Sequence, residues 1–523
     1  MDLAIKAGML VVFFGIMIGV GIYCRKHSTD VNGFVLGGRS VGPWLTAFAY
    51  GTSYFSAVVF VGYAGQFGWN FGVASTWAGV GNAILGSLLA WAILGRRTRV
   101  MSQHLNSATM PQFFEGRYGS KKLKLAAAVI IFVFLIPYTA SLYNGLSRLF
   151  GMAFNIDYSV CVIAMAVLTA VYVIVGGYMA TAINDFIQGI IMIFGIIAVV
   201  VAVLKSQGGF DEAFLRLSQV TDPEVSSNAG IFTSFLGPNP LGLLGVVMLT
   251  SMGTWGLPQM VQKFYAIKDE KSITKGMIIS TVFALVVAGG CYFLGGFGRL
   301  FFSSEEAMQA AGGYDSIIPT MLSGLSPVLI AVVVVLVLSA SMSTLSSLVM
   351  ASSSTLTLDF IKGTISKKMS EKKQLLIIRV FIAVFIAISV IIAIVQYKMN
   401  LSFIAQLMGI SWGALAGAFL GPFLYGLYWK RTSKASVWVC FIFSTVVMVA
   451  NILLKSWFPE ILQSPINAGV FCMLAGLVIV PVVSLLTKAP EKEQIEQVFS
   501  CYDKKVLVSA KHAIGDPVDK EEQ

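Results

Sequence analysis

The stretch SASMSTLSS, residues 339–347, places five serines and one threonine inside an otherwise apolar segment. It follows LIAVVVVLVL and precedes LVM, so a helix through this region would lie in or near hydrocarbon. On such a helix Ala340, Ser343, Thr344 and Ser347 share one face. Small residues and hydroxyls suit either close packing of another helix or a polar binding surface within the membrane. The spacing alone leaves both roles open.

The rest of the chain has the composition of a membrane protein. Of its 523 residues, 57% are hydrophobic and 12% are charged, whereas a soluble domain carries about 25% charged residues. A spanning helix needs about 20 mostly apolar residues. We therefore expect an all-α integral membrane protein with about thirteen transmembrane helices. The expected spans are residues 4–24, 43–66, 72–95, 125–149, 159–178, 186–204, 241–261, 276–298, 325–350, 376–397, 402–428, 435–454 and 466–487.

The connecting segments alternate in charge. Six alternate loops together hold 22 Lys and Arg residues, and the other six hold 5. Because basic loops face the cytoplasm, we expect the N-terminus outside and the C-terminus in the cytoplasm. The net charge of +11 then reflects loops lying against anionic lipid, and a nucleic-acid partner is not expected. The expected location is a bacterial cytoplasmic membrane, which the chain crosses many times.

Motifs for ATP use and for catalysis do not occur in the sequence. There is no GxxxxGK[ST] phosphate loop, no HExxH and no Ser-His-Asp order, so neither an ATP-driven pump nor an enzyme is expected. Ionisable residues are rare within the spans, and Asp185 and Arg148 are expected near span ends. The polar atoms available in the membrane are therefore hydroxyls, amides and carbonyls. Such neutral oxygens suit a hard monovalent cation.

Two expected spans are interrupted by weak helix formers. The second has Gly51, Thr52 and Ser53 at its middle, and the seventh contains LTSMGTWGLP, which ends at Pro258. Interrupted helices occur in membranes only where they line a cavity or the protein interior. Because the two breaks are five spans apart, they indicate an inverted five-helix repeat with a binding site at the breaks.

Several motifs resemble the sodium:solute symporter family, especially its proline and pantothenate carriers. FVLGGRSVGPWLTA, MSTLSS and LTKAPE are similar to the proline carriers, and GGYMATAINDFIQG and GLPQ are similar to the pantothenate carriers. The resemblance runs nearly from end to end. It implies the LeuT-type fold, a five-plus-five inverted repeat with one extra helix before it and two after it.

This fold divides the chain into six parts. They are the extra first helix and first cytoplasmic loop at 1–42, the first repeat at 43–204, an extracellular loop at 205–240, the second repeat at 241–428, two further helices at 429–487 and a cytoplasmic tail at 488–523.

The resemblance also implies where sodium binds. Carried onto the matching positions, the main sodium site of the family takes carbonyl oxygens from Thr52 and Phe55 in the second span. From the ninth span it takes the carbonyl of Ala340 and the hydroxyls of Ser343 and Thr344. These three residues lie on the hydroxyl face identified from the spacing, so for them we favour the binding role over the packing role.

Some relatives resemble a two-sodium design. The matching residues here are Asp185, Ser346 and Ser347, but Asp185 is equally well interpreted as an acidic residue at the N-terminus of the sixth span. Arg39 matches a family arginine at the cytoplasmic edge of the second span, with a coupling role, although an ordinary loop arginine would look the same.

The expected function is sodium-coupled import of a small organic solute by alternating access, with Na⁺ as the only cofactor. The solute is expected to be an amino acid such as proline or a small carboxylate such as pantothenate, and a short monocarboxylate stays open. Where proline carriers have an acidic residue, this chain has Tyr54. A sodium channel and a solute-sensing membrane protein are the alternatives from other classes. The residues expected to wall the solute are Ser56, Tyr138, Thr254, Trp255, Pro258, Gln406 and Trp412.

Overall fold

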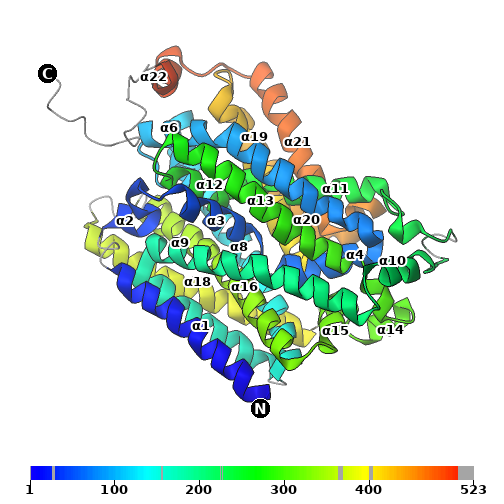
Figure 1. Cartoon of the computed structure of the whole chain (residues 1–523). Coiled ribbons are helices and arrows are strands. Elements are labelled where there is room, and N and C mark those ends of the chain that lie inside the picture. Colours follow the sequence, from blue (N-terminus) through cyan, green and yellow to red (C-terminus); the bar gives the residue numbers. More distant parts are fainter. Residues whose placement is uncertain are drawn as a thin grey trace.

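Long helices make up almost the whole molecule (Figure 1). The computed structural model describes residues 2–25, 30–154, 157–223, 225, 228–362, 369–399 and 404–503. Over these residues each of the thirteen expected spans coincides with a helix or a broken helix, which confirms the all-α class. An isolated parallel β-bridge joins Val41 to Ile267.

The helices have the following bounds. The first half of the chain forms α1 Asp2–Cys24, α2 Val31–Leu36, α3 Pro43–Tyr54, α4 Ala64–Phe71, α5 Thr76–Gly81, α6 Arg96–His104, α7 Met110–Tyr118, α8 Lys121–Phe154, α9 Tyr158–Ser206 and α10 Phe210–Ser218. The second half forms α11 Pro240–Met252, α12 Pro258–Ala266, α13 Glu270–Gly295, α14 Glu305–Ala310, α15 Ile317–Ser323, α16 Pro327–Thr355, α18 Glu371–Met399, α19 Ile404–Tyr428, α20 Lys434–Leu453, α21 Pro465–Leu486 and α22 Lys492–Asp503.

By length and hydropathy, ten of the described helices can cross a membrane, or eleven if the bent pair α11 and α12 counts as one span. The two other expected spans fail this test for visible reasons. Residues 43–66 are broken at Phe55, and their second half continues into the third span as one apolar stretch, Val58–His104. The first arm of α9, Tyr158–Val171, is apolar but short.

Helix α9 contains two of the expected spans. Its 49 residues would extend about 74 Å as one straight helix, more than twice the hydrocarbon thickness of about 30 Å. Gly177, with φ 60° and ψ −158°, breaks the helix into two arms. Asp185 lies eight residues beyond this break, in the interior of the second arm. The expectation that Asp185 opens a helix near a span end is therefore wrong.

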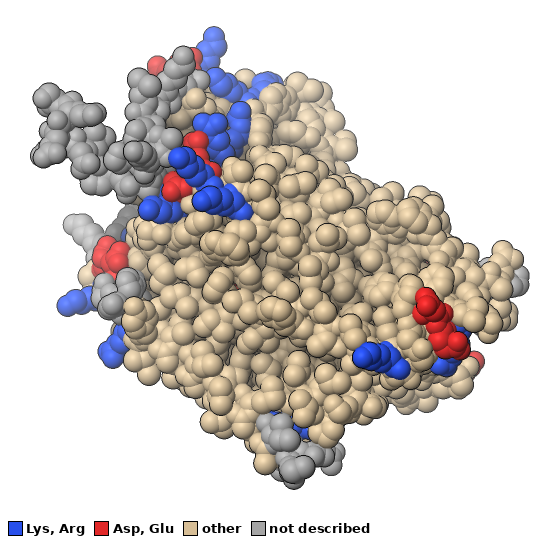
Figure 2. Space-filling model, viewed as in Figure 1, with Lys and Arg blue, Asp and Glu red and all other residues tan. Residues whose placement is uncertain are grey.

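On the face seen in Figure 2, charged side chains lie mainly toward two opposite ends, and uncharged surface lies between them. Lys and Arg gather at the end that carries α6 and α22, which we call the basic end. Large apolar side chains such as Phe194, Ile278 and Val446 are more than half exposed. An uncharged belt with exposed apolar side chains is the surface that a lipid bilayer covers.

Among the ten candidate spans, only α19 is more buried than α16. Helix α16 packs on α8, α9, α3 and α18. From Val333 to Thr355 every one of its residues is buried. A helix that is apolar or small on all sides is accommodated in this way, since it has no face to present to water. The SASMSTLSS segment therefore lies at the centre of the bundle.

Candidate functional site

The break in the second span frees backbone carbonyls. Helix α3 ends at Tyr54, and Phe55 has extended dihedral angles of φ −94° and ψ 128°. In an unbroken helix the carbonyl of Thr52 would accept a hydrogen bond from the N–H four residues later. Because the helix stops first, the carbonyl oxygens of Thr52 and Phe55 are available to other partners.

Two hydroxyls of α16 meet these carbonyls. Ser343 Oγ lies 3.1 Å from the Thr52 carbonyl and 3.1 Å from the Ala340 carbonyl. Thr344 Oγ1 lies 3.2 Å from the Thr52 carbonyl, 2.9 Å from that of Phe55 and 3.1 Å from that of Ala340. The structure thus brings together all five residues expected at the main sodium site, and all of them are buried.

This cluster of five oxygens has the chemistry of a site for a small hard cation. Ca²⁺, an ion of nearly the same radius as Na⁺, takes oxygen ligands at about 2.3–2.6 Å, and two oxygens sharing such an ion lie roughly 3–3.5 Å apart. The separations between the oxygens of α16 and those of Thr52 and Phe55, 2.9 to 3.2 Å, lie at the lower end of this range or just below it. All five are neutral, as suits a monovalent ion that needs its water replaced but no strong countercharge.

The residues expected at a second sodium site are arranged differently. Ser346 Oγ donates to the Ser343 carbonyl within α16. Ser347 Oγ lies 2.7 Å from Ser53 Oγ and accepts a hydrogen bond of 3.0 Å from Lys263 Nζ. The same ammonium lies 3.8 Å from Asp185 Oδ2. Sequence reasoning assigned Lys263 to a basic loop, but the structure buries it.

The break in the seventh span places α12 beside the site. Helix α11 continues into a 3₁₀ turn at Gly253–Gly256, Leu257 is extended, and α12 starts at Pro258 with a bend of 51°. A Cβ atom on Gly256 would lie 2.9 Å from the backbone nitrogen of Leu420, so a side chain there would collide with α19. Glycine at position 256 therefore allows the close approach between the seventh and eleventh spans.

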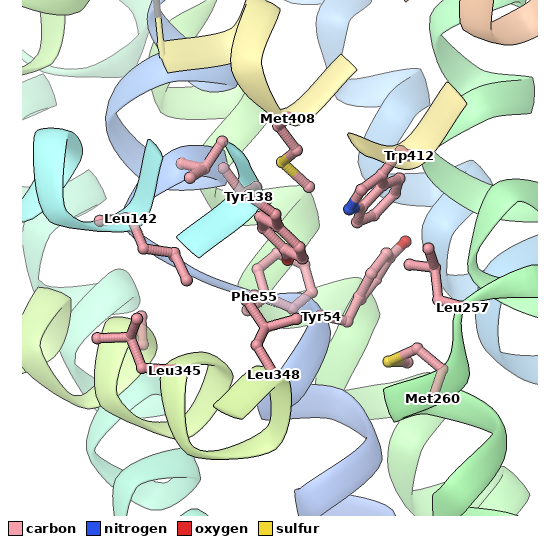
Figure 3. Close-up of a cluster of buried hydrophobic side chains, with 14 of the residues drawn as sticks. Tyr54, Phe55, Tyr138, Leu142, Leu257, Met260, Leu345, Leu348, Met408 and Trp412 are labelled. Atoms are coloured by element: carbon pink, nitrogen blue, oxygen red, sulfur yellow. The ribbon is translucent and has the colours of Figure 1, made fainter. Parts of the chain in front are cut away.

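Aromatic side chains gather next to the break in α3 (Figure 3). The Tyr138 and Trp412 rings meet edge to face at 5.9 Å, and Trp412 stacks on Tyr54 at 6.2 Å. The Tyr138 hydroxyl faces Ser56 and the Trp412 indole nitrogen. Yet the polar atoms of all four side chains are buried without a hydrogen bond among the described residues. Unsatisfied buried donors of this kind suit a polar solute that would supply the missing partners.

The other residues expected in the solute pocket are placed less clearly. Thr254 Oγ1 donates to the Ser251 carbonyl, and Trp255 Nε1 donates to the Leu85 carbonyl in the third span. The indole of Trp255 thus stabilises the helix packing. Pro258 is buried at the start of α12, and Gln406 is half-buried in the first turn of α19.

Sequence reasoning missed two residues of this region. Tyr54 was noted only as a departure from the proline carriers, but it forms one side of the aromatic group. Gln259 is buried, and both of its amide atoms lack a hydrogen-bond partner among the described residues. The signal for Gln259 was its place directly after the Pro258 that opens α12.

Arg39 joins three segments at the basic end. Its guanidinium donates to Ser102 Oγ, to the Tyr265 carbonyl and to the Ser107 carbonyl, at 3.2, 3.1 and 2.6 Å. Beside it, Val41 and Ile267 form the isolated bridge, which ties the start of the second span to the end of α12. The two broken spans are therefore fastened to each other at this end.

A separate cavity of about 260 Å³ lies between α8 and the segment 311–323, away from the expected solute residues. Arg148 and Asp315 line it, and Asp315 Oδ2 accepts a hydrogen bond of 3.2 Å from the backbone N–H of Ile404 at the start of α19. Burial raises the pKa of Asp315 to about 6, and the Arg148 charge and the Ile404 N–H oppose this effect.

The fold matches that of a solved membrane protein. The structure of a Na⁺-coupled sialic acid symporter matches with a TM-score of 0.74 at 18% identity, over 93% of this chain and 98% of that one. Together with the paired breaks, this match defines the fold of the protein, a LeuT-type bundle of membrane helices.

The family follows from the sequence comparisons. A model of the sodium:solute symporter family matches residues 34–443. A sodium/proline symporter of Haemophilus influenzae is 28% identical over 490 residues, which cover 92% of this chain and 94% of that protein. The osmoregulated proline transporter OpuE of Bacillus subtilis is 27% identical over 491 residues, with the same coverage. The chain belongs to the sodium:solute symporter family, so it couples the import of a small organic solute to sodium.

Proposed function

We propose that one Na⁺ binds among the carbonyls of Thr52, Phe55 and Ala340 and the hydroxyls of Ser343 and Thr344. Support comes from the convergence of these oxygens at about 3 Å across two helices that are nearly 300 residues apart in the chain. Each hydroxyl now donates its hydrogen to a carbonyl. On binding the ion, both would turn their lone pairs inward.

We further propose that the solute is a small carboxylate, bound beside this ion by Ser56, Tyr54, Tyr138, Gln259 and Trp412. The observation that carries this proposal is the set of buried hydroxyl, amide and indole donors without partners. Donors of this kind suit a carboxylate, whose oxygens are acceptors only. None of these side chains is acidic, so none offers a countercharge to a cationic amine.

A second candidate is proline, favoured by the curated relatives, which are proline transporters. Proline also carries a carboxylate, but its ammonium would have to bond to carbonyls or hydroxyls. The absence of an acidic side chain from the proposed pocket is why we place a carboxylate without an amine, such as pantothenate, first.

Uptake into proteoliposomes distinguishes the two candidates. We expect sodium-dependent accumulation of a labelled carboxylate from a panel of pantothenate and short monocarboxylates, and weaker competition by proline. The measurement is initial uptake with an inward Na⁺ gradient, with K⁺ in place of Na⁺ as the control. Saturable uptake of proline alone would reverse the order of the candidates, and a sodium current without any solute would indicate a channel.

We propose that Arg39 holds the basic end closed while the solute site is open to the other side. Release would then require its bonds to Ser102, Ser107 and Tyr265 to break, together with the bridge of Val41 and Ile267. With the basic end cytoplasmic, as the loop charges indicate, the solute would enter from outside and leave inward. The proposed repeats, 43–204 and 241–428, would move against each other around the ion.

A further inference from the structure

A lysine lies at the position where the family resemblance implies a second sodium. Lys263 and Asp185 are both fully buried, and their side chains are at most 2% exposed. The ammonium donates to Ser347 Oγ at 3.0 Å, and Ser347 was itself an expected sodium ligand. An ammonium ion and a bound Na⁺ at this point would use the same hydroxyl and the same carboxylate.

The charges around this point balance only when Lys263 is present. Asp185 has no hydrogen bond to either carboxylate oxygen among the described residues, and Lys263 is its ion-pair partner at 3.8 Å. A buried carboxylate without a countercharge is strongly disfavoured. With the ammonium in place the pair is neutral, and a sodium ion added beside it would be repelled by a like charge in a medium of low dielectric.

The point is also connected to the main sodium site. Ser347 follows Ser343 and Thr344 by one turn of α16, and its hydroxyl meets Ser53, the neighbour of Thr52. The ring of Tyr178 covers the ammonium, with Nζ 5.2 Å from its centroid. Lys263 reaches this point from α12, the half-helix that follows the break of the seventh span.

We propose that the Lys263 ammonium is a built-in cation that fills the second cation position, so that the carrier binds one sodium ion instead of two. This inference rests on the proposed function, since it takes the main sodium site as given. The alternative is an ion pair that only stabilises the packing of α12 on α9. The two differ in what the position does when the lysine is removed.

Equilibrium binding of ²²Na⁺ to the purified full-length protein tests the proposal without knowledge of the solute. We expect one saturable Na⁺ per wild-type chain and two per chain of Lys263→Gln, because the freed Asp185 carboxylate and Ser347 hydroxyl then accept an ion. The double variant Lys263→Gln/Asp185→Asn should return to one. Lys268→Gln, the same exchange at an exposed lysine of the next segment, should stay at one.

Other results would overturn the proposal. One ion per chain in Lys263→Gln, in a sample that is monodisperse and melts cooperatively, would leave only the fastening role. If Lys263→Gln does not fold, Asp185→Asn and Lys263→Arg are measured instead, and both should bind one Na⁺ per chain. If the wild type binds two Na⁺ and Asp185→Asn binds one, Asp185 is a sodium ligand and the proposal is wrong. A wild type that binds no Na⁺ would instead contradict the proposed function itself.

Discussion

At the scale of single residues, the site depends on hydroxyls that bond to backbone carbonyls of another helix. Serine and threonine in a membrane helix usually return their hydrogen to their own backbone, as Ser346 does. Ser343 and Thr344 do this as well, but they also reach Thr52 across the helix boundary. It is this second contact that separates a binding residue from a packing residue.

Replacement of Ser343 or Thr344 by alanine tests the main sodium site. Each substitution removes one oxygen from a shell of five, and loss of a bond to a charged partner costs about 1.5–3 kcal/mol. We expect the sodium concentration for half-maximal binding or uptake to rise about 10- to 100-fold. Ser341→Ala removes a buried hydroxyl from the same helix and should change it little. Unchanged sodium dependence in both site variants and in their double would assign the hydroxyl face to packing.

The family resemblance assigns the residues of the proposed main site, and two patterns in the sequence agree with that assignment. The hydroxyl face follows from helical periodicity, and the matching break follows from glycine and serine at residues 51–53. Lys263 could not be predicted in this way, since it lies near the basic end of a span and looks like a loop lysine. Its burial depends on the bend after Leu257, which turns α12 into the bundle.

At the scale of helices, the breaks at Phe55 and Leu257 and the long helix α16 determine the arrangement. Sequence patterns located both breaks but not the directions of side chains around them. Trp255 was expected in the pocket, and its indole instead bonds to the Leu85 carbonyl. That direction is set by how the 3₁₀ turn packs on the third span, which the sequence does not state. The helical course of α9 through Asp185 was missed for a similar reason, because residues 179–185 were expected to connect the fifth and sixth spans.

The start of α19 should respond to pH through Asp315. Its pKa is raised from 3.8 to about 6 in the folded protein, so the folded state holds its proton more tightly than the unfolded state. Stability from this group is therefore greatest below pH 3.8 and falls as the pH rises through 6, by at most about 3 kcal/mol. Asp315→Asn removes this dependence. Its melting temperature should rise relative to wild type between pH 4 and pH 7.

The control for this measurement is Glu306→Gln, an exposed carboxylate on the same connection. Its melting temperature should follow that of the wild type over the same pH range far more closely than the Asp315 variant does. A constant difference between wild type and Asp315→Asn from pH 4 to pH 7 would mean that Asp315 has an ordinary pKa.

At the scale of the whole molecule, the two charged ends and the uncharged belt indicate a single orientation in the membrane. Lys263 is buried, so it no longer counts among the Lys and Arg residues of the basic loops. The excess of Lys and Arg in those loops over the other loops is hardly changed. The positions of the apolar helices along the chain were predictable because hydrophobicity acts over whole segments. The burial of individual charges was not, because it depends on contacts between segments far apart in the chain.

Cysteine labelling tests the orientation. Lys122, in the first turn of α8, and Gln219, directly after α10, are both exposed, whereas five of the six native cysteines are buried. With the half-buried Cys501 replaced by serine, Lys122→Cys should react with an impermeant maleimide only from the cytoplasmic side. Gln219→Cys should react only from outside. Reaction of both from one side would contradict the thirteen-span arrangement.

The lysine within the bundle limits how far the carrier can concentrate its solute. With a single mobile cation, a monovalent anion crosses as an electroneutral pair, so the membrane voltage does no work on it. A tenfold sodium ratio, about 1.4 kcal/mol, then supports about a tenfold solute ratio. A zwitterion carried with one Na⁺ moves one net charge inward and gains about 2.3 kcal/mol more per 100 mV. The sodium ratio and a voltage of about 100 mV together then allow roughly 500-fold accumulation. The charge of the solute, more than its affinity, thus decides whether this protein concentrates it steeply or only matches the sodium ratio.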